Sequence, residues 1–131
     1  MASMGTRGIA GGLAAVAAVE KGLPLKRLKR LAGLGLSFTE VDEVAVPART
    51  VKHRKSRGEP LSAQESDRVL RIERLVGQAE ELFGEREKAL RWLRRSGGGL
   101  GGRTRLSLLK TESGGRAVEQ MLIRIADGIY S

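Results

Sequence analysis

The feature that most constrains the fold is a long helical pattern that follows Ser62. Ser62 and Glu65 have the spacing of a capping box, in which a serine and a glutamate side chain each pair with a backbone amide at a helix start. Behind them, apolar residues recur at helical spacing on one face, namely Val69, Ile72, Leu75, Val76, Ala79 and Phe83. Gly84 follows as a natural helix end. The longest helix of the chain is therefore expected between Ser62 and Phe83.

Similar start and stop signals divide the rest of the chain into shorter helices. Pro24 suits the first turn of a helix that ends at Gly33 and Gly35, and Ser37 with Glu40 forms a second capping box. Further helices are expected over residues 13–21, 47–55, 85–95, 105–109 and 111–127. No segment of the sequence shows a sustained apolar–polar alternation, so the predicted fold class is all-α.

The charge balance points to an anionic partner. The 131 residues include 24 lysines and arginines against 15 aspartates and glutamates, which gives a net charge of +9. A protein this basic usually binds nucleic acid or a strongly acidic protein. Residues 1–60 hold 11 basic and 5 acidic residues, whereas residues 61–131 hold 13 and 10. The anion-binding surface is therefore expected in the first part of the chain.

The residue inventory argues against an enzyme. The chain has no cysteine and one histidine, His53, which excludes thiolate zinc sites, iron–sulfur clusters and thiol nucleophiles. The glycine-rich run from Gly97 to Gly102 lacks the Gly-Lys-Ser/Thr sequence of a phosphate-binding loop. The apolar stretch from Ile9 to Val19 is too short to cross a bilayer. We therefore expect no catalytic residue, metal, cofactor, small-molecule substrate or membrane contact, and a cytoplasmic location.

Residues 39–57 have the layout of a helix-turn-helix, with a short helix, a tight turn and a short basic helix. Arginine can read guanine in the major groove, and lysine and threonine can hold phosphates. The DNA-binding candidates are Arg49, Thr50, Lys52, His53, Arg54, Lys55 and Arg57, with Val51 facing the core. A solvated basic helix is the alternative, because Ala45 stands where the usual turn glycine is expected.

A second basic run, Lys26 to Arg30, places four cations within five residues. These cations could clamp phosphates beside the groove, or they could form the charged outer face of an amphipathic helix, which we favour at this point.

The end of the chain carries an apolar stripe of Val118, Met121, Leu122 and Ile125 at helical spacing. Ile129 and Tyr130 continue this apolar character beyond Gly128. The stripe is expected either to be core or to contact a partner protein.

Three runs of the sequence are distinctive, namely VPARTVKHRKSRGEPLSAQESDRVLRI, LFGEREKALRWLRR and LGGRTRLSLLKTESGGRAVEQMLIRIADGIYS. Together they resemble the Xre/ParS-type antitoxins, which are partners of RES-domain toxins in bacterial type II toxin–antitoxin operons. The resemblance covers residues 22–131, and its most specific part is the pattern GRT-x-L-x-L-L-x-T-E-x-G-x-R-x-V-E from Gly102 to Glu119. Arg105 departs from the family, which commonly has proline at this position.

We expect the chain to divide into three parts. The residues of the first part, 1–21, favour a flexible or weakly helical segment. The resemblance implies that residues 22–60 form an Xre-like helix-turn-helix region that represses its own operon, and that residues 61–131 form a helical dimerisation and toxin-binding region. RES toxins consume NAD⁺, and an antitoxin of this family, which is not an enzyme, covers the active-site entrance of the toxin. The toxin-binding candidates are Arg116, Glu119, Gln120, Ile123, Arg124, Ile125, Asp127, Gly128, Ile129, Tyr130 and Ser131.

Two further expectations concern partners. We expect a homodimer through the apolar face of residues 69–83 and Trp92, because a chain of 131 residues has limited core to absorb both. We expect Ile125, Ile129, Tyr130 and a carboxylate at Ser131 to dock at the toxin's NAD⁺ entrance. The alternatives are a stand-alone helix-turn-helix regulator without a toxin partner, and an interaction protein that has lost DNA binding.

Overall fold

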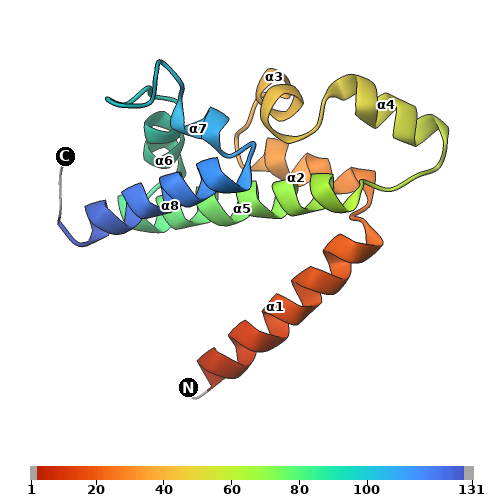
Figure 1. The fold of residues 1–131 in the computed structure, drawn as a ribbon, viewed down its shortest axis with the longest axis horizontal. Helices are drawn as coiled ribbons and strands as arrows, with labels where there is room; N and C mark the ends of the chain where they lie inside the picture. Colours follow the sequence, from red (N-terminus) through yellow and green to blue (C-terminus); the bar gives the residue numbers. More distant parts are fainter. Residues whose placement is uncertain (1–2, 129–131) are drawn as a thin grey trace.

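The computed structural model describes residues 3–128, with side chains described from Gly12 onward, and over this range it confirms the all-α fold (Figure 1). The order of helices is α1 Ser3–Lys21, η1 Leu25–Arg27, α2 Leu28–Gly33, α3 Phe38–Glu40, η2 Val41–Ala45, α4 Ala48–Ser56, α5 Ala63–Phe83, α6 Arg86–Leu93, α7 Arg105–Leu108 and α8 Glu112–Ala126.

Helix α5 is the central element, and its ends are those that the sequence predicts. The Ser62 hydroxyl accepts a hydrogen bond from the Glu65 amide at 3.1 Å, and the Glu65 carboxylate accepts one from the Ser62 amide at 2.8 Å. Gly84 ends the helix with φ +85°, a left-handed conformation that glycine adopts without steric cost. Helix α8 lies along α5 and runs in the same direction (Figure 1).

Most of the apolar face of α5 is buried inside the monomer. Its five aliphatic residues from position 69 to 79 have no exposed surface, namely Val69, Ile72, Leu75, Val76 and Ala79. Trp92 is half-buried between Phe83 and Arg105. The centroids of the Phe83 and Trp92 rings lie 5.6 Å apart, and the Arg105 guanidinium carbon lies 4.5 Å from the centroid of the Trp92 ring. The expectation that this face forms a dimer interface is therefore wrong for the residues from Val69 to Ala79, because α1, α2, α6 and α8 cover them. Trp92 keeps some exposed surface, so a dimer contact at Trp92 stays a prediction.

Helix α1 is longer than the expected residues 13–21, and it diverges from the body of the molecule (Figure 1). Its joint to the body is closely packed. The amide of Leu23 donates to the buried Ser66 hydroxyl at 2.8 Å, and the carbonyl of Leu23 accepts from the Leu61 amide at 2.9 Å. Within the described residues, no helix combines the length and the apolar character needed to cross a membrane.

Helices α2, α3, η2 and α4 form the helix-turn-helix side of the molecule. The second capping box is present, since the Glu40 amide donates to Ser37 Oγ at 3.1 Å and the Ser37 amide donates to Glu40 Oε1 at 2.8 Å. After Glu40 the helix widens to a π-helical turn, in which the Val46 amide donates to the Val41 carbonyl at 3.0 Å.

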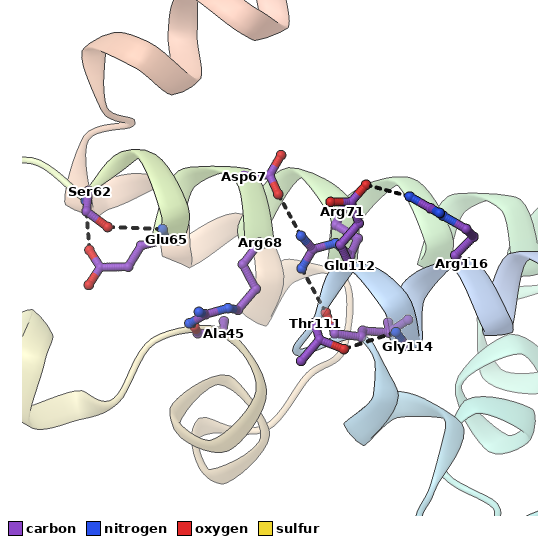
Figure 2. Close-up of polar contacts among 11 residues, drawn as sticks. Ala45, Ser62, Glu65, Asp67, Arg68, Arg71, Thr111, Glu112, Gly114 and Arg116 are labelled. Carbon is purple, nitrogen blue, oxygen red and sulfur yellow. Dashed lines mark hydrogen bonds and ion pairs between the residues drawn. The ribbon is translucent and has the colours of Figure 1, made fainter. Parts of the chain in front are cut away.

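This π-turn explains why Ala45 can replace the expected turn glycine. Val46 leaves the helix with φ −141°, and no residue other than glycine in the described chain has a positive φ. The Ala45 carbonyl, freed at the helix end, accepts a hydrogen bond from Arg68 on α5 at 2.7 Å (Figure 2). The turn therefore reverses the chain without the left-handed residue that would require glycine.

Candidate functional site

Helix α4 presents a basic surface, and few contacts hold the helix to the rest of the molecule. Pro47 precedes the helix, and the Asp42 carboxylate accepts a hydrogen bond from the Ala48 amide at the helix start. No side chain of α4 is fully buried, and Val51 is half-buried against the core, as predicted. The helix therefore projects most of its side chains away from the body.

Most of the predicted DNA-binding residues on α4 are free to meet a partner. Five of them are exposed, and in the described part of the chain none forms an ion pair with a carboxylate, namely Arg49, Lys52, His53, Lys55 and Arg57. Thr50 is half-buried. The structure thus brings these side chains together on α4 and at its C-terminal cap, where Arg57 Nη1 lies 3.4 Å from His53 Nε2.

Arg54 differs from its neighbours, because its guanidinium is already engaged. Its Nε lies 2.7 Å from Glu65 Oε1, and its Nη1 lies 3.6 Å from Glu59 Oε1. The hydrogen bond that Arg54 donates to the Glu65 carboxylate raises the pKa of Arg54. Burial acts to raise the pKa of Glu65, but the hydrogen bonds from Arg54 and Ser62 hold this pKa below its ordinary range. Arg54 therefore fastens α4 to the first turn of α5.

The most specific sequence pattern, from Gly102 to Glu119, builds the corner between α7 and α8. Thr104 and Thr111 cap the two helices by accepting hydrogen bonds from backbone amides at 3.1 and 3.0 Å. Gly114 is required because a Cβ there would lie 1.9 Å from the Leu108 carbonyl oxygen. Arg71 on α5 holds the corner by donating to the Leu109 carbonyl at 3.2 Å (Figure 2).

Arg105 shows what replaces the proline that is common at this position. It is the first residue of α7, and it donates to the Trp92 carbonyl at 3.1 Å while its guanidinium lies over the Trp92 ring. Burial and the charge of Arg95 both lower the pKa of Arg105. The side chain thus ties α7 to α6.

The predicted toxin-binding residues lie along α8, and most of them are accessible. Six are exposed, namely Arg116, Gln120, Ile123, Arg124, Asp127 and Gly128, whereas Glu119 and Ile125 are half-buried. Ile129, Tyr130 and Ser131 lie outside the described residues. The proposed docking of the last residues therefore stays a prediction.

A shallow groove runs between α5 and α8 beside these residues. Its volume is about 340 Å³, and it is lined by Gln78, Glu81, Leu82, Glu119, Leu122, Ile123 and Ala126. Glu119 accepts hydrogen bonds from Arg74 at 2.6 Å and from Gln78 at 3.3 Å, so its carboxylate is fixed at the edge of the groove. Ile123 is 47% exposed and offers an apolar contact at the same place.

Arg94, the residue directly after α6, ties the end of α6 to α3 and to the loop that precedes α3. Its guanidinium donates to both Glu40 oxygens at 2.8 and 2.9 Å, and to the Gly35 carbonyl at 2.8 Å. The hydrogen bond from Arg94 lowers the pKa of Glu40, and the same contact raises the pKa of Arg94. Sequence reasoning missed this link, because no local pattern joins residues more than fifty positions apart.

Comparison with known proteins assigns both halves of the chain to one group. Residues 14–74 match the antitoxin Xre-like helix-turn-helix domain, and residues 78–128 match the antitoxin Xre/MbcA/ParS C-terminal toxin-binding domain. A relative in Sphingobium sp., the Prs ADP-ribosylating antitoxin, is 30% identical over 127 residues, which cover 88% of this chain and 80% of that protein. The chain belongs to the Xre/MbcA/ParS antitoxin family.

Other antitoxins support this membership. The antitoxin Xre of Pseudomonas putida is 41% identical over 93 residues, which cover 71% of this chain and 58% of the relative. The antitoxin Xre of Yersinia enterocolitica is 33% identical over 87 residues, which cover 66% of this chain and 59% of the relative. This antitoxin-family chain thus spans less than two thirds of the length of these two relatives. The relatives are named as antitoxins and not as enzymes.

Proposed function

We propose that this antitoxin neutralises a cognate NAD⁺-consuming RES-domain toxin by covering its active site, and that it represses its own operon by binding operator DNA. In this proposal it acts in the cytoplasm. The carrying observation is that one chain combines a helix-turn-helix with exposed cations on α4 and a toxin-binding-domain match with an accessible α8. The name of the Sphingobium relative refers to ADP-ribosylation, a reaction that uses NAD⁺, and this supports a NAD⁺-consuming toxin.

The toxin contact is proposed to follow α8 and the groove beside it. Ile123 and Leu82 would supply the apolar anchor, and the exposed charges of Arg116 and Arg124 would form the rim. Interfaces of this kind take most of their binding energy from a few buried apolar or aromatic side chains. Ile123→Asp is therefore expected to weaken toxin binding strongly, because it places a charge at the centre of the contact.

Co-expression with the product of the adjacent gene, followed by size-exclusion chromatography, tests the partner. A single complex and survival of cells that produce the toxin support the proposal. Absence of a complex with any neighbouring RES protein would favour the stand-alone regulator. A variant without residues 128–131 tests the role of the last residues. If cells that produce the toxin survive with this variant, α8 itself blocks the active site of the toxin.

The operator contact is proposed to use Arg49, Lys52, His53, Lys55 and Arg57, with Thr50 beside them, while Arg54 holds the helix in place. The double substitution of Arg49 and Lys52 by alanine is expected to abolish the electrophoretic shift of the operator. Toxin binding should survive, because neither side chain contacts the core. An unchanged shift at moderate salt contradicts the DNA assignment.

A homodimer is part of the proposal, because helix-turn-helix proteins read two half-sites with two copies. Its interface must use a surface other than the residues from Val69 to Ala79 that are buried in the monomer. Light scattering at micromolar concentration is expected to give about twice the chain mass of 14.1 kDa. A monomer at every concentration contradicts this part.

A further inference from the structure

We propose that Lys29 and Phe38 belong to the DNA-binding surface, and that the sugar–phosphate backbone of the duplex crosses the groove between α2, α3 and α4. This inference rests on the proposed operator binding and extends it to residues outside α4. It also changes the interpretation of the Lys26–Arg30 run. The sequence favoured the charged outer face of an amphipathic helix, whereas Lys29 is now assigned to a phosphate contact.

The groove has a volume of about 510 Å³ and an apolar wall, which is formed by Leu28, Ala32, Val41, Val46 and Val51. Its rim carries Lys29 from α2 together with Lys52 and Lys55 from α4. The fold thus places Lys29 beside two lysines of the recognition helix.

The positive charge of this rim is compensated by the protein only in part. Within residues 12–128, none of the three lysines forms an ion pair. Among the described residues that line the groove, Asp42 is the one acid, and its carboxylate accepts a hydrogen bond from the Ala48 amide, so three lysines face one carboxylate. Like charges held side by side repel each other, and an external anion removes this cost. The rim is therefore suited to phosphate groups.

Phe38 is the feature that a charge argument alone does not explain. It is the first residue of α3, it lines the same groove, and 78% of its side chain is exposed. The DNA backbone alternates charged phosphates with deoxyribose rings whose carbon atoms are apolar. An exposed aromatic ring among three lysines matches this alternation, since the ring can pack on a sugar while the ammonium groups hold the flanking phosphates.

The extent of the positive surface favours a long polyanion over a small one. Beyond the groove, Arg49 on α4 and Arg57 at its C-terminal cap are exposed, and so are Lys26 and Arg30, which lie in the same short basic run as Lys29. These two residues are exposed and form no ion pair in the part of the chain that the structure describes. A small amphipathic anion would fill the groove and leave these outer cations unused, whereas a duplex reaches all of them.

The test is a salt titration with a duplex that carries the DNA directly upstream of this gene. Each lost phosphate contact lowers the slope of log K against log salt by about 0.9, which corresponds to about fivefold weaker binding at 0.15 M salt. Lys29→Gln is expected to produce this change. Lys88→Gln, an exposed lysine on α6 without an ion pair among the described residues, is the matched control and should leave the slope unchanged.

Phe38→Ala separates the sugar contact from the charge contacts. It is expected to weaken binding several-fold at every salt concentration with no change of slope, because no charge is removed. Val16→Ala on α1 is the control, since Val16 is an apolar side chain that is 55% exposed and far along the chain from the groove. Both residues are exposed, so circular dichroism should show unchanged folding for each variant.

The outcomes are distinguishable. If the wild type binds the duplex but Lys29→Gln keeps the full slope and Phe38→Ala keeps the full affinity, the inference is overturned and operator binding stands. If the wild type binds no DNA in a salt-dependent manner, both the inference and the operator proposal fail. If the two variants instead weaken the toxin complex and leave DNA binding intact, the surface belongs to a protein partner and the inference is again overturned.

Discussion

Helices α4 and α8 are both proposed to meet a partner, but they are attached to the body in opposite ways. Helix α8 buries Gly115, Val118 and Leu122 against its neighbours, whereas α4 has no fully buried side chain. The attachment of α4 depends on the Asp42 cap, the ion pair of Arg54 and the half-buried Val51. One helix is thus held by packing and the other by a few polar contacts.

This difference determines how binding and folding can be separated. The exposed cations of α4 can be replaced with little effect on stability, because they contact nothing that holds the fold together. On α8 the binding face and the buried face belong to the same short helix. A loss of toxin binding by an α8 variant therefore requires a stability measurement before it is assigned to the interface.

The largest effect is expected from Leu122→Ala on the buried face of α8. Leu122 is 4% exposed, and removal of a buried leucine side chain costs about 2–5 kcal/mol in the free energy of unfolding. Urea denaturation measures this loss. The alanine pair at Arg49 and Lys52 on α4 should change the same quantity by less than about 0.5 kcal/mol. Equal losses in the free energy of unfolding for the α8 and α4 variants would contradict the view that α8 is held by packing and α4 by a few polar contacts.

A smaller loss is expected from Gly114→Ala at the α7–α8 corner. A methyl group there would meet the Leu108 carbonyl, a backbone atom that cannot move aside, and overpacking of this kind costs about 1–3 kcal/mol. Gly77→Ala on α5 is the matched control, because no atom lies within 4 Å of its added methyl group. It should stabilise the helix by about 0.5–1 kcal/mol, and thermal unfolding should therefore move in opposite directions for the two variants.

A pH-dependent effect is expected from Glu40→Gln, which weakens the link between α3 and α6. Because the pKa of Glu40 is lowered below 4.5 in the folded state, its contribution is fully present above about pH 4.5 and is lost as the pH falls through the folded pKa. At neutral pH the free energy of unfolding of the wild type should exceed that of the variant by about 0.5–1 kcal/mol. The difference is small because the ion pair between Glu40 and Arg94 is partly exposed to solvent.

Urea denaturation over a pH series checks this prediction. Glu43→Gln serves as the control, since Glu43 is exposed and forms no ion pair within the described range. A gap between wild type and Glu40→Gln that persists undiminished in acid would show that the carboxylate charge is not the source of the stabilisation.

The smallest change in stability is expected from Arg116→Gln on the exposed face of α8. Its ion pair with Glu112 at 2.9 Å joins side chains that are 71% and 74% exposed, and such pairs contribute little to folding. The melting temperature should stay unchanged while the dissociation rate of the toxin complex rises. A lower melting temperature would instead assign Arg116 a structural role.

The sequence by itself determined the local features of the fold. Both capping boxes and the end of α5 at Gly84 lie where the residue order predicts them. These features depend on hydrogen bonds within four residues, so the local pattern contains the information needed to predict them. Val51 is packed against the core, as predicted.

Only the tertiary structure decided which of these residues have partners. Arg54 looks like its basic neighbours in the sequence, yet the fold places Glu65 beside it. Lys29 belongs to another basic run, yet it shares a groove with Lys52. The apolar face of residues 69–83 suggested a dimer interface, but α1, α2, α6 and α8 cover its residues from Val69 to Ala79. The chemical type of a side chain sets what it can bind. Its actual contacts depend on how segments far apart in the sequence pack together, and local periodicity does not predict this packing.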